Sequence, residues 1–130
     1  MAVYKIFPTK DASLYSEFPS MNTGLDAIIE ASTYLKLGTP QVSRYLIQFS
    51  TTEIQNLLNN RVNGASFSSS LKNSAAVVTS LNLDTELEVH TISGSWGMGT
   101  GRYGNSPQTT NGTSWVWRSY SGSNAWLSTG

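Results

Sequence analysis

"SRYLIQFS", residues 43–50, alternates large apolar side chains with others more regularly than any other part of the chain. Tyr45, Ile47 and Phe49 fall on one side of an extended backbone. Because successive side chains of a strand point to opposite faces, this period of two predicts a half-buried β-strand. We expect these three side chains to lie in the core.

The period changes directly after this strand, in "STTEIQNLLNN", residues 50–60. Ile54, Leu57 and Leu58 recur at i, i+3 and i+4, which is the spacing of one helical face. The serine and the first threonine of this stretch are each able to cap a first turn. The sequence therefore predicts one short helix near residues 51–60.

Further β-candidates lie on both sides of this strand and helix. One helical segment cannot supply the crossovers that a parallel sheet needs. We therefore predict an all-β fold, an antiparallel β-sandwich (jelly roll) with one short helix, in which residues 1–130 form a single domain. The additional strand candidates are "AVYKIF" (2–7), ending at Pro8, "ASLYSEF" (12–18), "AIIEASTYLKLG" (27–38), "AAVVTSLNL" (75–83), "ELEVHTIS" (86–93) and, more weakly, "SWVWRSY" (114–120).

The C-terminal end carries an unusual signal for a sandwich. Trp126 and Leu127 resemble the start of an apolar strand, and the sequence stops three residues later. A sandwich normally needs more strands after such a point to cover its faces. This predicts either a domain truncated at its C-terminal end or one completed by strands from elsewhere in an assembly.

The composition excludes several classes of function. The formal net charge is zero and 12% of residues are charged, so the chain has no basic surplus for a nucleic-acid backbone. The absence of cysteine excludes disulfides, thiolate zinc sites and a cysteine nucleophile. No apolar run is long enough to span a bilayer, and the N-terminus does not read as a signal peptide. We expect no nucleic-acid partner and no membrane association.

Glycines and aromatic residues dominate "WGMGTGRYGNSPQTTNGTSWVWR", residues 96–118. It contains "GTGRYG", a literal match to the G-x-G-x-x-G of dinucleotide-binding proteins. That motif needs a helix after the glycines and an acidic residue further on, but "NSPQTTNG" follows and no acidic residue occurs after Glu88. We interpret these glycines as allowing close packing and left-handed backbone in an irregular loop.

Catalytic and metal-binding patterns are weak. His90 is the only histidine and is interpreted as a surface or edge-strand residue, and the eight carboxylates are scattered, so that their spacing indicates no acid–base pair. We therefore predict that the chain is not an enzyme and has no cofactor. One alternative to solvated loop carboxylates is a structural Ca²⁺ held by Asp11, Asp26 and Glu30.

The aromatic residues of the last third are the main binding candidates. Exposed Trp and Tyr rings stack on sugars or act as hot spots of protein interfaces, and buried ones close the end of a sandwich. Arginine side chains can stack on such rings. The candidate partner- or glycan-binding residues are Trp96, Arg102, Tyr103, Trp115, Trp117 and Arg118.

Four stretches together resemble the DNRLRE-type domain. They are "FPTKDASLYSEFPSMNTG" (7–24), "SRYLIQFSTTEI" (43–54), "AAVVTSLNL" (75–83) and "ELEVHTISGSWGMGTG" (86–101). The family is a jelly-roll unit similar to carbohydrate-binding modules, found in secreted bacterial surface proteins and in some marine phage structural proteins. This chain departs from it at Ser50, where the family has Asp, and in lacking closing strands after Trp126.

The resemblance implies binding or assembly rather than catalysis. The N-terminus and the "GTSWVWR" variant look more like the phage versions than the secreted ones. The expected function is that of a non-enzymatic virion structural protein, in head decoration, tail or baseplate, which contacts other virion proteins or copies of itself. The alternative is a carbohydrate-binding module that recognises surface glycans through its Trp- and Tyr-rich loops.

Overall fold

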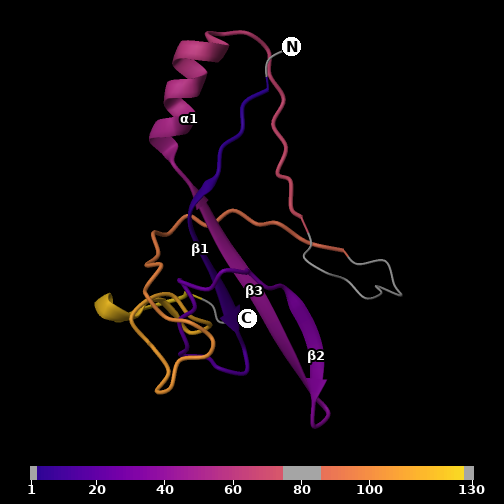
Figure 1. Ribbon diagram of the computed structural model, residues 1–130, viewed down its shortest axis with the longest axis vertical. Helices are drawn as coiled ribbons and strands as arrows, with labels where there is room; N and C mark the ends of the chain where they lie inside the picture. Colours follow the sequence, from indigo (N-terminus) through magenta and orange to yellow (C-terminus); the bar gives the residue numbers. More distant parts are fainter. Residues whose placement is uncertain (1–2, 75–85, 128–130) are drawn as a thin grey trace.

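The computed structural model describes residues 3–74 and 86–127, which form a β-rich fold with one short α-helix, as predicted. Figure 1 shows the strands in the middle and lower parts of the molecule and the helix at its upper end. The elements are β1 (Pro8–Tyr15), β2 (Ser32–Lys36), β3 (Thr39–Phe49), α1 (Thr51–Leu57), a π-helical turn (Leu58–Val62), β4 (Trp117–Ser119), a 3₁₀ turn (Tyr120–Gly122) and β5 (Asn124–Ala125).

Strands β1, β3 and β2 pair in that order as an antiparallel sheet, and β4 and β5 form a separate two-stranded ribbon. A two-residue turn joins β2 to β3, with φ of 49° at Leu37 and 81° at Gly38. Two consecutive positive φ angles are those of a type I′ turn, which matches the right-handed twist of the flanking strands. The register places Ala12 opposite Leu46, so both side chains lie on one face of the sheet.

The core lies on that face. Ala12, Leu14 and Leu46 are buried beneath Trp96, which is 7% exposed. Met98, Trp115 and Trp126 pack around this cluster and are partly buried. The residues that cover the sheet thus come from the last third of the chain and reach it as irregular segments.

The prediction that Tyr45, Ile47 and Phe49 form the core is wrong. All three are half-buried, and Tyr45 and Ile47 lie on the face opposite Leu46. The alternation misled because Arg44 shares the core face, where its guanidinium lies 4.8 Å from the centre of the Trp115 ring. A charged residue can occupy a core face when an aromatic ring covers it.

The predicted helix is confirmed. The Ser50 side chain accepts a hydrogen bond of 3.2 Å from the Glu53 N–H, so it is the N-cap, and α1 begins at Thr51. The helical backbone continues as the π-helical turn and ends at Asn63, which has φ of 44°. No residue of α1 is fully buried. The helix therefore stands at one end of the molecule without a complete hydrophobic cover.

Several predicted strands differ from the structure. Residues 3–7 are not in a strand, and β1 begins at Pro8 instead of ending there, since an edge strand tolerates the missing N–H of proline. Only Ala12–Tyr15 of the segment 12–18 is in β1. Residues 86–93 pair with no described strand. The predicted strand 75–83 lies outside the described residues.

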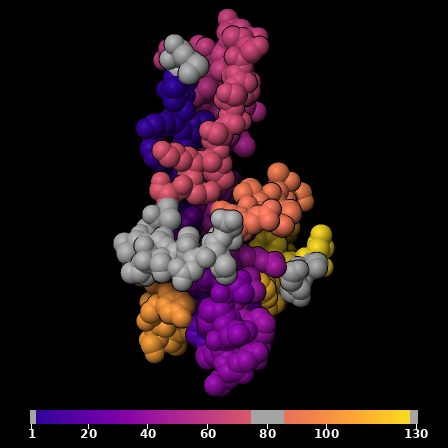
Figure 2. Space-filling model, turned by 90° about the vertical axis from the view of Figure 1, so that its right-hand side faces the viewer, coloured from indigo at the N-terminus to yellow at the C-terminus, as the bar shows by residue number. Residues whose placement is uncertain are grey.

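The molecule is elongated. Figure 2 shows the N-terminal segment and the residues that follow α1 at one end, and the β2–β3 hairpin at the other. Loops of residues 96–116 lie beside the lower half of the sheet (Figure 1). Within the described part of the chain, none of the helices has the length and apolar character needed to cross a membrane.

Candidate partner-binding site

Asn22 organises the region that carries the candidate site. Its side chain is fully buried, and its Nδ2 donates to the carbonyl oxygens of Met98 (2.7 Å) and Thr113 (2.9 Å). Its Oδ1 accepts from the Gly101 N–H at 2.8 Å, and its own N–H donates to Thr109. One side chain from the loop after β1 thus fixes the irregular segment 98–113 against the sheet.

Close approach to Asn22 explains the glycines of this segment. A Cβ added at Gly99 or at Gly112 would collide with the Asn22 side chain, and one at Gly101 with its backbone. Gly99 also has a positive φ of 74°. Close packing, which was predicted for these glycines, is therefore confirmed at all three positions, and the predicted left-handed backbone is confirmed at Gly99.

Tyr103 is held at the outer side of this loop. The Tyr103 N–H lies 3.2 Å from each carboxylate oxygen of Asp26. A short turn supports it, because the Asn105 side chain accepts from the Arg102 N–H at 2.7 Å. The Tyr103 ring makes edge-to-face contacts with Tyr15 at 5.2 Å and with Phe18 at 5.7 Å between centroids. The ring is thus fixed in position while half of the residue stays exposed.

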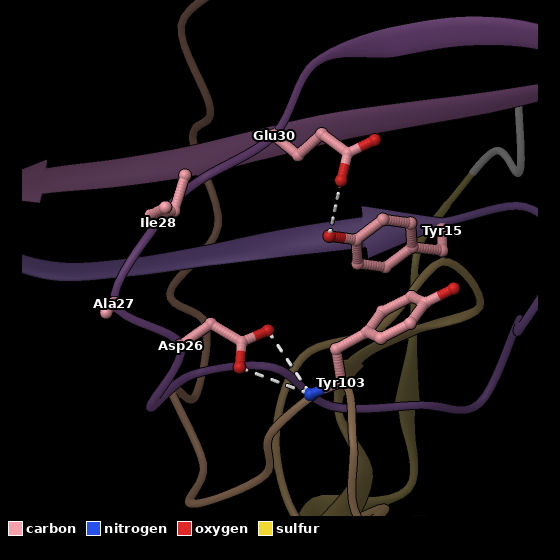
Figure 3. Close-up of a pocket in the computed structure, with 6 residues that line it drawn as sticks. All are labelled: Tyr15, Asp26, Ala27, Ile28, Glu30 and Tyr103. Carbon is pink, nitrogen blue, oxygen red and sulfur yellow. Dashed lines mark hydrogen bonds between the residues drawn. The ribbon is translucent and has the colours of Figure 1, made fainter. Parts of the chain in front are cut away.

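A cleft of about 290 Å³ opens beside this ring, on the face of the sheet opposite the core (Figure 3). Tyr15 reaches it from β1, Tyr103 from the glycine-rich loop, and the segment 26–30 from the connection to β2. Tyr15 donates a hydrogen bond of 3.2 Å to Glu30. The cleft therefore combines two phenol rings, two carboxylates and the exposed apolar side chain of Ile28. We call it the tyrosine cleft.

The charged groups that line the tyrosine cleft are negative. Burial raises the pKa of Tyr15 to about 12, and the charges of Glu30 and Asp26 add to the effect. Tyr15 therefore remains a protonated hydrogen-bond donor at neutral pH. Carboxylates and aromatic rings in this arrangement can accept hydrogen bonds from hydroxyl groups and can face a cation or the apolar side of a sugar ring.

A second ionic group lies on the same face of the sheet. Tyr34 and Lys36 of β2 both donate hydrogen bonds to the Glu17 carboxylate. These bonds, first the one from Lys36 and then the one from Tyr34, hold the pKa of Glu17 below its usual value. The bond to Glu17 raises the pKa of Tyr34 to about 12, and Tyr103 and Glu30 contribute smaller effects.

The six residues predicted as one binding surface lie in three places. Trp96 and Trp115 face the core, where Lys10 lies 5.7 Å from the Trp96 ring centre and Arg44 covers Trp115. Tyr103 faces the opposite side, next to Arg102, which is exposed. The structure thus brings together two pairs from this set, one on each face of the sheet.

Trp117 and Arg118 form the third place, in β4. The Trp117 ring makes an edge-to-face contact with Tyr120 at 5.7 Å. Arg118 packs against Gly94, where an added Cβ would lie 2.5 Å from its Nη1. The Arg118 Nε is buried and has no hydrogen-bond partner among the described residues. Arg118 thus holds the ribbon against the segment before Trp96, whereas Trp117 packs against the turn of the ribbon itself.

A second cavity, of about 670 Å³, lies on the core side of the sheet. His90 and Glu88 reach its rim, and the two side chains contact each other at 3.2 Å. Both side chains are more than three-quarters exposed, in keeping with the surface position predicted for His90. The cavity is lined by Leu14, Arg44, Tyr45, Leu46, Glu88, His90, Thr91, Ile92, Ser93, Trp115 and Trp126.

The three carboxylates named as calcium ligands are divided. Asp26 and Glu30 line the tyrosine cleft, whereas Asp11 lies in β1 opposite Ile47 and does not line it. Among residues 3–74 and 86–127, no group of three His, Cys, Asp or Glu side chains is placed to hold a metal ion. The two carboxylates of the cleft instead accept hydrogen bonds from the protein itself.

Sequence reasoning missed Asn22 and Tyr15 as site residues. Asn22 lies in "PSMNTG", a stretch dense in turn residues, so it read as part of a surface loop. Tyr15 read as an ordinary strand residue. The only signal was the glycine spacing of residues 97–112, which indicated close packing without showing what is packed there.

No family model, curated protein or solved structure matches the chain. The resemblance to the DNRLRE-type domain therefore remains a prediction.

Proposed function

We propose that the chain is a non-enzymatic structural component of a phage virion, which acts through protein–protein contacts with other virion proteins or with copies of itself. In this proposal the full fold is an antiparallel β-sandwich of jelly-roll type. The three-stranded sheet and the aromatic segments over its core face are its two layers, and neighbouring molecules complete them.

The observation that carries this proposal is the amount of exposed surface. The chain exposes 9892 Å², whereas a compact monomer of 14.1 kDa exposes about 6,700 Å². The difference, about 3,000 Å² on one chain, exceeds the roughly 800 Å² that each partner contributes to a standard protein interface. Contacts with partners would remove this surface from water.

The character of the exposed surface supports the same proposal. Exposed apolar side chains occur from the N-terminal segment to the end of the described chain. Contacts with partners would bury such side chains and remove their apolar surface from water. Eight large apolar residues are 63% or more exposed: Val3, Phe7, Ile28, Leu35, Leu37, Phe67, Val89 and Leu127.

The proposed location is tested on particles. Virions purified by density gradient from the source of this sequence, after nuclease and protease washes, should contain the chain at a fixed ratio to the major capsid protein by quantitative mass spectrometry. A soluble host protein measured in the same gradient serves as the control. If the amount of the chain falls during purification by the same factor as the amount of the soluble host protein, the virion assignment is overturned.

The tyrosine cleft favours a second function, glycan recognition. An exposed ring held by two edge-to-face contacts is a pre-organised platform for the apolar face of a sugar. The carboxylates of Asp26 and Glu30 provide acceptors for sugar hydroxyl groups beside it. This candidate uses Tyr103 but none of the predicted tryptophans, since Trp96 and Trp115 face the core.

A glycan array separates the two functions. If the tyrosine cleft binds sugars, Tyr103→Ala should abolish glycan binding and Tyr4→Ala should leave glycan binding unchanged. Tyr4 is a matched control, because it is 49% exposed and Tyr103 is 50% exposed. A chain that binds no glycan, or that binds equally well without the Tyr103 ring, removes the second function.

A further inference from the structure

Strand β2 presents an open edge. It pairs with β3 on one side, and no described strand pairs with it on the other. Figure 1 shows β2 at the outer border of the sheet. An unpaired edge carries a row of free N–H and C=O groups and is a template for a further strand. Natural proteins usually cover such an edge or place charges along it, but Lys36 is the only charged residue of β2.

The turn fixes which backbone groups point outward. In a two-residue hairpin the residues that flank the turn, here Lys36 and Thr39, form a hydrogen-bonded pair. Alternation then directs the N–H and C=O of Tyr34 and Ser32 toward β3 as well. The groups of Thr33 and Leu35 point away from the sheet and are available to another strand.

We propose that β2 pairs with β2 of a second copy of this chain, antiparallel and around a two-fold axis at Tyr34. This inference rests on the proposed assembly function and names one of its contacts. Thr33 of each copy then lies opposite Leu35 of the other, so that all four outward N–H groups and their carbonyls find partners. The two three-stranded sheets become one sheet of six strands.

Charge complementarity supports this register. It places Lys36 of each copy opposite Ser32 of the other, not opposite a second lysine. Ser32 donates a hydrogen bond of 2.6 Å to Glu30, which lies on the same face. Lys36 keeps its ion pair with Glu17 of its own copy, and this pair comes to lie beside Ser32 and Glu30 of the other copy, so that no lysine faces a lysine across the axis.

The apolar side chains of the hairpin support a second copy as the occupant. Leu35 is 72% exposed and Leu37 is 99% exposed, although Leu37 occupies a positive-φ turn position that leucine seldom adopts. In the proposed register Leu37 lies opposite Ala31 of the other copy, and Leu35 opposite Thr33. Leu37 then gains an apolar neighbour, and Leu35 packs against the methyl-bearing side chain of Thr33 on the face of the sheet that carries the core.

The experiment is sedimentation velocity on the full chain over a range of concentrations. Leu35→Pro removes one outward N–H without affecting a bond to β3, since proline is tolerated at an edge. Leu35→Thr keeps that N–H and is the matched control. We expect the proline variant to raise the dimer dissociation constant about tenfold or more relative to the threonine variant.

Two double variants test the register and do not depend on proline. Thr33→Lys with Leu35→Lys opposes lysines at both crossings and should give monomers. Thr33→Glu with Leu35→Lys opposes glutamate to lysine and should restore the dimer. Tryptophan fluorescence and unfolding midpoints establish that each variant is folded.

The outcomes separate this inference from the proposed function. A dimer that survives both the proline and the double-lysine changes overturns pairing through β2 but leaves assembly standing. A wild-type chain that remains monomeric at all concentrations overturns the pairing and also counts against the assembly function.

Discussion

The side-chain amide of Asn22 donates a hydrogen bond of 2.9 Å to the carbonyl oxygen of Thr113, ninety-one residues further along the chain. Both residues are fully buried. This contact ties the loop after β1 to the irregular C-terminal third, which has few regular hydrogen bonds of its own. The side-chain amide of Asn22 therefore holds these loops together by hydrogen bonds, as backbone hydrogen bonds hold the strands of a sheet together.

Replacing Asn22 should be strongly destabilising. Asn22→Ala leaves the carbonyls of Met98 and Thr113 and the Gly101 N–H without their partner. We expect the free energy of unfolding to fall by about 3–5 kcal/mol in denaturant titrations. Asn56→Ala, an exposed change on α1, should alter it by about 0.5 kcal/mol or less. Equal effects of the two changes would show that Asn22 is not a structural hub.

The glycines provide a matched pair in the same loop. A Cβ at Gly101 would collide with the Asn22 backbone, whereas one at Gly104 meets nothing within 4 Å. Gly101→Ala should therefore cost about 2–4 kcal/mol. Gly104→Ala should be neutral or stabilising by up to about 1 kcal/mol, because it restricts the unfolded chain. Thermal unfolding of the two variants side by side checks this, and the reverse order would contradict the packing described.

The choice of core face can be tested on β3. Leu46→Ala removes a side chain buried under Trp96 and should cost about 2–5 kcal/mol. Ile47→Ala, on the opposite and half-buried face, should cost about 1–2 kcal/mol. A larger loss at Ile47 than at Leu46 would restore the face that the alternation predicted.

Stability should fall at high pH because of Tyr15. Burial first, and then the charges of Glu30 and Asp26, raise the pKa of Tyr15 from 10.0 to about 12. Between these two pH values the unfolded chain has lost the proton that the folded chain retains, so stability declines as pH rises and is fully present below pH 10. Tyr15→Phe should flatten part of this decline in unfolding experiments. An unchanged slope would show that Tyr15 does not titrate as described.

Local signals in the sequence predicted the helix and the central strand. The change of period after Ser50, together with its capping hydroxyl, is contained in eleven consecutive residues and needs no distant partner. The alternation of residues 43–50 likewise predicted the second half of β3, although the strand begins earlier, at Thr39.

The face of β3 that forms the core could not be predicted in this way. It depends on the Arg44 guanidinium lying over the Trp115 ring, and these residues are far apart in the sequence. The site depends equally on distant contacts, because Asp26 fixes Tyr103. The sequence does not distinguish a buried loop asparagine from an exposed one. The role of Asn22 could therefore be recognised only from the structure.

The most direct test of assembly is the mass of the full chain in solution, measured by sedimentation equilibrium as its concentration is raised. We expect species larger than the 14.1 kDa monomer to dominate, because the exposed apolar surface is withdrawn from water when copies associate. A cooperatively folding chain that stays at the monomer mass at every concentration would contradict this expectation.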